Sequence, residues 1–190
     1  MKTKFKGSPQ KRRLGAFYYY LYNKFLNVRI TRKEAAEIEK YVRKRLLSKV
    51  KLVPYCLYVL CWLKKRNFKL ALINNGHPAK TNEVLRKFDL RKFFDIVVTS
   101  GEVGYEKCTG IPFKVALEKL NLSPREVIMV GDRIDEDVVG AKKVGIIAVK
   151  FNFGYWKNRW YGKKVKPDFV INSLKELIPL IKNLNSRDQN

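Results

Sequence analysis

Four acidic residues lie within six positions of a chain that is otherwise strongly basic. Asp132, Asp135, Glu136 and Asp137 follow the apolar run 127–130 and a glycine, in a protein with 17 acids, 41 lysines and arginines and a net charge of +24. Carboxylate oxygens are the ligands that hard cations such as Mg2+ prefer. Acids are also favoured in the first turn of any helix by the helix dipole. This second interpretation explains Asp132 less well, because Asp132 comes directly after the predicted strand.

Polar side chains also follow two other apolar runs. Asn74, Asn75 and Gly76 come after the run 69–73, and Lys107 lies in the loop after the next such run. A phosphate group is bound by lysine ammonium groups and by backbone N–H groups. In open parallel sheets, ligands bind outside the carboxyl ends of the strands, where these residues would converge. The side chains at these strand ends would serve both a phosphate group and a hard cation, while the helix-dipole interpretation of the acids stays open.

The apolar runs alternate with amphipathic helical patterns along most of the chain. These short runs are typical of buried parallel strands and lie at residues 69–73, 95–99, 127–130, 146–149 and 168–171. Their alternation with helices predicts an α/β fold, with a doubly wound, Rossmann-like parallel sheet that is covered on both faces.

The first third of the chain is predicted to be helical. Apolar residues at helical spacing between Leu14 and Phe25 indicate one helix, and Thr31 with Glu34 forms a capping box for a second. A further helix is expected after Pro54. We therefore expect a helical subdomain at residues 1–66, an α/β core at residues 67–185 and a loose tail at residues 186–190.

Cysteine content and hydropathy argue against a disulfide-rich, zinc-binding or membrane-spanning protein. Cys56, Cys61 and Cys108 are odd in number and lack the C-x-x-C spacing, which argues against a disulfide framework or a zinc site and for a reducing cytoplasm. The longest apolar stretch, residues 52–63, is too short to span a bilayer. We therefore expect a cytoplasmic protein with no membrane partner.

The net charge of +24 would favour polyanionic partners. Residues 151–166 interleave aromatic side chains with lysines and arginines, a composition typical of surfaces that bind single-stranded nucleic acid. The same composition suits the rim of a site for a phosphorylated substrate, or packing against another part of the chain. Nucleic acid is the less favoured partner, because no recognised nucleic-acid-binding fold accompanies the segment.

Residues 68–180 resemble the haloacid dehalogenase superfamily, in its phosphatase-like branch with a helical cap. FKLALINNG resembles the second motif of that family, and GYEKCTGIPFKVALEKL resembles the third, with Phe113 six residues after Lys107. VIMVGDRIDEDVVGAKKVGI resembles the fourth motif, in which Gly-Asp is followed five positions later by another Asp, here Asp132 and Asp137. The helical residues 1–66 resemble part of the cap.

This resemblance implies Mg2+-dependent hydrolysis of a small phosphoester. Lys107 would neutralise the phosphoryl charge, and Asn74 would donate to a phosphate oxygen, with Asn75 and Gly76 beside it on the substrate side. Asp132 would ligate Mg2+, and Asp137 would ligate the ion or orient its water shell. The sequence departs from the family in two of these motifs, because Asn74 replaces a hydroxyl residue and Cys108 replaces a proline.

A third departure concerns the family's first motif, Asp-x-Asp, which supplies the nucleophile at the end of the first strand. This sequence has no aspartate before Asp89. In the family, that first strand lies between the strands equivalent to 69–73 and 127–130, so its absence would leave two unpaired edges inside the sheet. We therefore expect an incomplete chain that is inactive alone and self-associates through the gap. The alternative is a non-catalytic remnant that binds polyanions or nucleic acid.

Overall fold

The computed structural model describes residues 28–159 and 165–187. The chain divides into two compact units, Met1–Lys51 and Leu52–Asn190. In the first unit, α2 (Arg32–Lys49) begins after Thr31, whose hydroxyl accepts from the backbone N–H of Glu34 at 3.2 Å while Glu34 accepts from the Thr31 backbone at 2.6 Å. The predicted capping box is therefore confirmed. The helix predicted between Leu14 and Phe25 lies outside the described residues.

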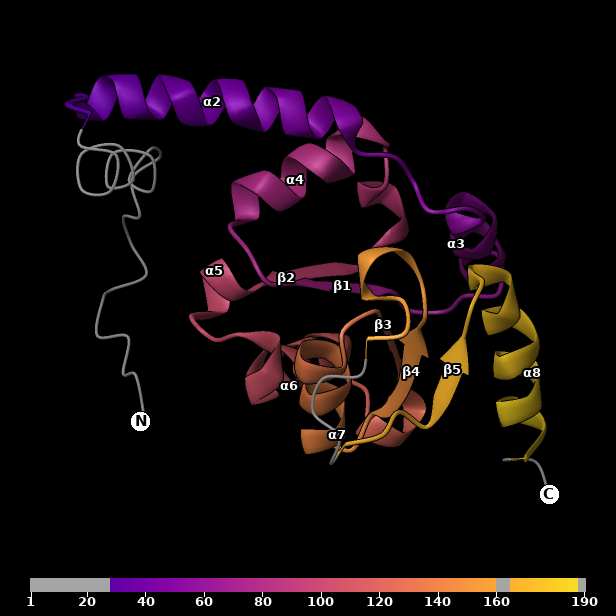
Figure 1. The fold of residues 1–190 in the computed structure, drawn as a ribbon. Helices are drawn as coiled ribbons and strands as arrows, with labels where there is room; N and C mark the ends of the chain where they lie inside the picture. The colour runs from indigo at the N-terminus through magenta and orange to yellow at the C-terminus, as the bar shows by residue number, and fades with distance from the viewer. Residues whose placement is uncertain (1–27, 160–164, 188–190) are drawn as a thin grey trace. The chain divides into compact units, whose positions relative to one another are not determined.

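The second unit alternates strands with helices, as Figure 1 shows. Its parallel strands are β1 (Ala71–Asn74), β2 (Ile96–Thr99), β3 (Ile128–Gly131), β4 (Ile147–Phe151) and β5 (Phe169–Ile171). Its α-helices are α3 (Cys56–Lys64), α4 (Pro78–Lys87), α5 (Ser100–Val103), α6 (Ile111–Leu120), α7 (Val139–Lys143) and α8 (Leu177–Arg187). A π-helical turn, η5 (Ile134–Val138), leads into α7. The prediction of an α/β fold with parallel strands is confirmed.

The strands form two separate parallel sheets, β1–β2 and β3–β4–β5. Within the described residues, β1 pairs only with β2, and β3 pairs with β4 alone. All four residues of β1 are half-buried, and Val130 in β3 is 36% exposed, whereas Val98 in the outer strand β2 is 2% exposed. The division of the sheet falls between the strands where the sequence predicted a gap.

Helices on both faces hold the two sheets in one core. On one face, Phe113 and Leu117 of α6 pack with Met129 of β3 and with Ile73 of β1, so a single helix covers both sheets. On the opposite face of β4 and β5, apolar side chains of α3 and α8 form a second cluster, and Figure 1 shows these two helices on that side. Alternate residues of β4 point to the two clusters, as the two-residue period of a strand requires.

Helix α3 belongs to the same compact unit as the strands. The sequence placed the end of the helical subdomain at residue 66, whereas the units divide after Lys51. The reason is packing, because Val59 and Leu63 of α3 are buried against Val149 of β4 and Leu177 of α8.

Across residues 28–159 and 165–187, no helix is both long and apolar enough to cross a membrane. Cys56, Cys61 and Cys108 are free thiols. Part of the segment of interleaved aromatic and basic residues, at 160–164, lies outside the described residues.

Candidate active site

The acidic cluster occupies the turn that follows β3. Asp137 is 4% exposed, and its Oδ2 accepts from the backbone N–H of Arg133 at 3.0 Å. The same side chain lies directly over the end of β3, because a Cβ at Gly131 would be 2.4 Å from the Asp137 Cγ. The Gly-Asp motif therefore has a steric reason, since only glycine leaves room for the second carboxylate.

Asp132 differs from the other three acids in its partners. Asp135 forms an ion pair with Arg133 at 2.5 Å, and Glu136 lies 3.5 Å from the same guanidinium. Among the ion pairs of the described residues, none involves the Asp132 carboxylate. Burial raises the pKa of Asp132, and the nearby charge of Asp137 raises it further. This carboxylate is therefore the one that a cation from solution would stabilise most.

Lys107 reaches the acidic turn from the segment between α5 and α6. Its Nζ lies 2.5 Å from Oδ1 of Asp137, and the two side chains are 15% and 6% exposed. The approach depends on Gly140 in α7, where a Cβ would be 2.1 Å from the Lys107 carbonyl oxygen and 2.6 Å from Cε2 of Phe113. The spacing between Lys107 and Phe113 thus lets both the turn that carries Lys107 and helix α6, which carries Phe113, pack against Gly140.

Asn75 connects the end of β1 to both of these groups. Its Oδ1 accepts from the backbone N–H of Lys107 at 2.9 Å, and its Nδ2 donates to Glu136 at 2.6 Å. Because β1 and β3 belong to different sheets, this side chain joins the two sheets at their carboxyl ends. The predicted residues Asn75, Lys107, Asp132 and Asp137 are therefore brought together.

Asn74 and Gly76 make their hydrogen bonds elsewhere. The Asn74 amide donates to the hydroxyl of Thr81 in α4 at 2.9 Å, and the backbone N–H of Gly76 donates to Ser100 Oγ at 2.9 Å. His77 is exposed and caps α4, because its Nδ1 accepts from the backbone N–H of Ala79. The roles predicted for Asn74 and Gly76 stay predictions.

Two residues at this site, Arg133 and Lys150, were not singled out from the sequence. Arg133 takes part in the network just described. Lys150, in the middle of β4, is fully buried, and its Nζ donates to the carbonyl oxygen of Asp132 at 3.0 Å. A lysine that interrupts the apolar run from Ile146 to Phe151 is the sequence signal that could have identified it.

The donor set fits part of a magnesium site. Within the described residues, no group of three or more histidine, cysteine, aspartate or glutamate side chains is placed to hold a metal ion. Asp132 and Asp137 still offer carboxylate oxygens next to one another, and Mg2+ in proteins commonly keeps several waters with one or two carboxylates. The arrangement therefore fits a mostly hydrated ion.

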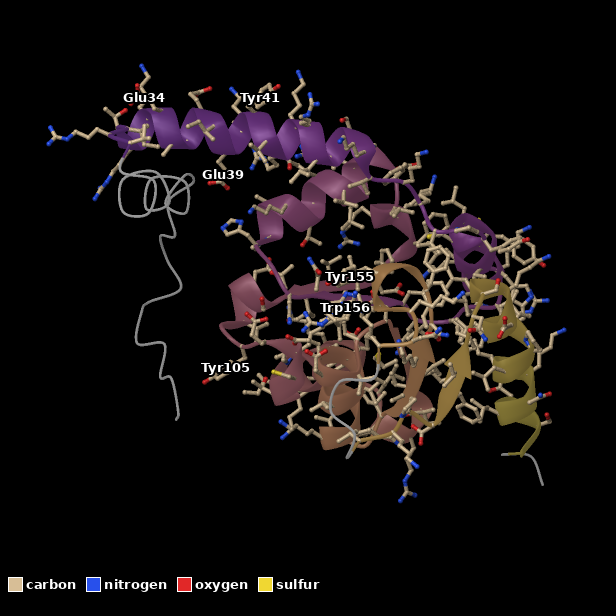
Figure 2. All side chains as sticks on the ribbon, in the orientation of Figure 1. Glu34, Glu39, Tyr41, Tyr105, Tyr155 and Trp156 are labelled. Carbon is tan, nitrogen blue, oxygen red and sulfur yellow. The ribbon has the colours of Figure 1, made fainter. Side chains whose placement is uncertain are left out.

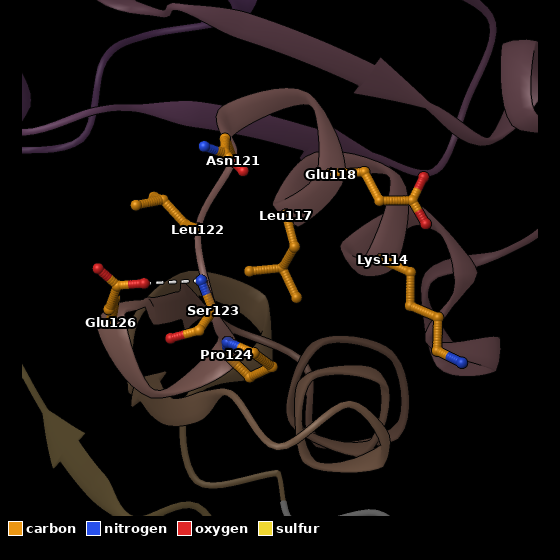
Figure 3. A pocket seen from close by; sticks show the side chains of 8 residues that line it. All are labelled: Lys114, Leu117, Glu118, Asn121, Leu122, Ser123, Pro124 and Glu126. Carbon is orange, nitrogen blue, oxygen red and sulfur yellow. Dashed lines mark hydrogen bonds between the residues drawn. The ribbon is translucent and has the colours of Figure 1, made fainter.

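A shallow hollow of about 550 Å³ lies at the other end of β3 (Figure 3). It is formed where α6 ends and the chain turns toward β3, between Leu117 and Glu126. The hollow precedes the first residue of β3, whereas Asp132 follows the last. It is therefore separate from the acidic turn.

Known proteins resemble both the sequence and the fold. A sequence model of the haloacid dehalogenase-like hydrolases matches residues 12–145. A protein of Pyrococcus furiosus named glyceraldehyde 3-phosphate phosphatase is 35% identical over 137 residues, which are 72% of this chain and 57% of that protein. Pyrophosphatase PpaX of Bacillus mycoides is 32% identical over 123 residues, 65% of this chain and 56% of that protein. The chain thus spans just over half the length of these relatives.

A solved structure shows the same arrangement of elements. The crystal structure of a HAD phosphatase from Thermococcus onnurineus superposes with a TM-score of 0.67 at 28% identity, covering 87% of this chain and 69% of that one. The match of a family model over most of the chain, the identity to its phosphatase-named relatives and the shared fold lead to one conclusion. The chain belongs to the haloacid dehalogenase-like hydrolase family.

Proposed function

We propose that this chain supplies the phosphate-binding and metal-binding part of a Mg2+-dependent phosphatase that acts on a small phosphoester. The observation that carries the proposal is the 2.5 Å contact of Lys107 with Asp137, next to an Asp132 carboxylate that no described cation pairs with. The names of the relatives, a sugar-phosphate phosphatase and a pyrophosphatase, support a small phosphorylated substrate. They do not favour the alternative of a polyanion-binding remnant.

Each residue of the network has a role in this proposal. Lys107 neutralises the charge of the bound phosphoryl group, and Asp132 with Asp137 holds Mg2+. The ion, when bound, supplies further positive charge where negative charge develops on the phosphoryl oxygens. Asn75 holds the turn that carries Lys107 next to the acidic turn through its two hydrogen bonds. Asn74 turns its amide from Thr81 toward a phosphate oxygen, beside the backbone of Gly76.

Hydrolysis through an aspartyl-phosphate needs a carboxylate nucleophile. No aspartate occurs before Asp89, and we propose that the nucleophile comes from a strand outside these 190 residues, placed between β1 and β3. Until that strand is supplied, the exposed edges favour self-association of the chain. We place the protein in the cytoplasm, because free thiols at Cys56, Cys61 and Cys108 suit a reducing compartment.

Binding of orthophosphate tests this proposal without requiring turnover. Calorimetric titration of the chain with phosphate in the presence of Mg2+ should give a one-site isotherm. Lys107→Met, titrated under conditions in which circular dichroism shows it to be folded, should weaken that affinity at least tenfold, because the ammonium is the cation nearest to the proposed phosphate position. Lys92→Met, which removes an exposed lysine elsewhere, is the matched control and should leave the affinity unchanged. Equal affinities for all three proteins would refute the assigned site.

A further inference from the structure

Lys150 is a fully buried lysine, with 0% of its surface exposed. Lysine is among the residues least often buried completely, because removing an ammonium group from water is costly unless its N–H groups are paired. Here Nζ donates to the backbone carbonyl oxygens of Asp132 at 3.0 Å and of Trp156 at 3.2 Å. The buried ammonium group is therefore hydrogen-bonded, and this one side chain joins two separate segments of the chain.

The pleat of β4 explains how the side chain reaches Asp132. Ala148 packs in the cluster of α6 and α7, whereas Val149 and Phe151 pack against α3 and α8. Because side chains alternate along a strand, Lys150 shares the face of Ala148, next to the turn after β3. A hydrophobic side chain of similar length would fill the same space but would leave the two carbonyl oxygens without this donor.

The segment joined to Asp132 is the aromatic loop, which we define as residues 152–158. Its base is closed by Asn152, which accepts from the backbone N–H of Asn158 at 2.7 Å and donates to the Asn158 side chain at 3.0 Å. Tyr155 and Trp156 lie edge to face on this loop, with ring centroids 5.1 Å apart, and Figure 2 shows them next to one another. The loop is therefore an ordered unit that can be positioned as a whole.

A second cation holds the same loop from the side of the acidic turn. The guanidinium of Arg133 lies 4.7 Å from the centre of the Trp156 ring and also pairs with Asp135. Trp156 is thus held through its ring by Arg133 and through its carbonyl group by Lys150. Both contacts connect the aromatic loop to the residues that follow β3.

We propose that Lys150 is a positioning residue, which fixes the backbone of Asp132 and the aromatic loop as one wall of the phosphate site and thereby sets the orientation of the Asp132 carboxylate. The effect on the loop is independent of the proposed function. The effect on Mg2+ rests on it, because it requires that Asp132 binds the ion.

The test uses tryptophan as a local reporter and Lys150→Met as the change. The chain has three tryptophans, Trp62, Trp156 and Trp160, so two single-tryptophan forms are made by Phe substitution. One form retains Trp156 in the aromatic loop. The other retains Trp62, which packs on Phe68 in the cluster of α3 and reports on the core. Acrylamide quenching and emission maxima are then compared with and without Lys150→Met.

In the Trp156 form, Lys150→Met should increase quenching severalfold and shift the emission to longer wavelength, because the loop detaches. The Trp62 form should not change. Unchanged signals in both forms would overturn the proposal, and so would equal changes in both, which would mean a general role in folding. If Lys150→Met does not fold, Lys150→Leu, which also removes the N–H donor, is judged by the same two signals.

Mg2+ affinity gives a second readout, because loss of the positioning role and loss of the lysine charge would change this affinity in opposite directions. Removing a positive charge beside Asp132 would by itself strengthen Mg2+ binding. Loss of orientation should instead weaken it by about 10- to 100-fold, the usual effect of removing a residue that orients a metal ligand. Tighter binding by Lys150→Met would overturn the positioning role. If the unaltered chain binds no Mg2+, the proposed function fails, while the tryptophan comparison still decides the role of Lys150.

Discussion

The Lys107 ammonium and the Asp137 carboxylate lie 2.5 Å apart, and neither side chain is more than 15% exposed. Lys107 comes from the segment after β2, and Asp137 comes from the turn after β3. The ion pair therefore connects the two sheets, together with the hydrogen bonds of Asn75.

The first prediction concerns this buried pair. Lys107→Met should lower the free energy of unfolding by about 3–5 kcal/mol, because it leaves the Asp137 charge buried without its partner. Asp137→Asn in the same background should recover part of that loss, which a double-mutant cycle with urea unfolding measures. Lys92→Met is the control, since the exposed pair of Lys92 with Asp89 should contribute less than about 1 kcal/mol. Equal effects of the two lysine substitutions would contradict the assignment.

The second prediction distinguishes a metal ligand from a helix-dipole acid. Asp132→Asn should abolish the rise in melting temperature on addition of Mg2+, while raising the melting temperature without Mg2+. The reason is that burial and the charge of Asp137 disfavour the ionised form of Asp132, as its raised pKa indicates. Asp135→Asn, in the same turn, should retain the Mg2+ response. Identical responses of the original chain and Asp132→Asn would favour the helix-dipole interpretation.

The third prediction concerns turnover. The chain of 190 residues should show no Mg2+-dependent hydrolysis of an aryl phosphate above a protein-free blank, since no aspartate lies before Asp89 to act as the nucleophile. The measurement is a continuous assay of phenol release. Clear turnover that Asp132→Ala abolishes would show that another residue performs the nucleophilic step.

Elements of this fold were predictable where local chemistry determines them. The capping box at Thr31 depends on two residues three positions apart, and it occurs as predicted. The sequence predicted the ends of the strands to within about two residues, because apolar runs between helical patterns are typical of buried parallel strands. The gap in the sheet followed from a missing motif, and β1 and β3 indeed lie in different sheets.

Long-range contacts account for what the sequence did not reveal. Asn75 and Asn74 are adjacent and chemically alike, yet Asn75 joins the acidic turn and Asn74 bonds to Thr81. Periodicity along one strand gives no information on which amide faces which neighbour. Lys150 is recognisable only when β4 is placed beside the turn after β3. Similarly, α3 could be assigned to the core only from its packing against α8.

The fourth prediction concerns acid unfolding at the start of β1. The backbone N–H of Leu70 donates to Asp95 at 2.7 Å and so lowers the pKa of that carboxyl, despite partial burial, with help from Lys64 at 3.1 Å. The folded pKa lies below the unfolded value of about 3.9, so the stabilisation is complete above that value and is lost as the pH falls through the folded pKa.

Asp95→Asn should therefore destabilise the chain at pH 7, by no more than about 1 kcal/mol for so exposed a group. The difference from the original chain should vanish as the pH falls below the lowered folded pKa of Asp95. Thermal melts across the pH range measure it. Asp89→Asn, at an exposed aspartate whose pair with Lys92 is on the surface, is the control. A difference that persists at low pH would mean that the Asn side chain, rather than the lost charge, causes the effect.

The last prediction concerns the unpaired edges of β1 and β3. Each strand pairs on one side only within the described residues, so N–H and C=O groups on the other side must find water or another strand. Both strands carry apolar side chains, and unprotected apolar edges recruit further strands. The chain alone should therefore self-associate, despite a net charge of +24, and should be marginally stable. Light scattering combined with thermal melts measures both properties.

Supplying a strand should reverse both effects. A fused or added segment with an apolar strand ending in Asp-x-Asp should raise the melting temperature, reduce scattering and, if Asn74 is tolerated, restore some hydrolysis. A segment of the same composition with proline at alternate strand positions is the control, because proline has no N–H to donate and should not pair. If the chain alone proves monodisperse, unfolds cooperatively and is no less stable than the supplemented form, the two sheets are closed without a further strand. In that case the edges of β1 and β3 are not a binding site for one.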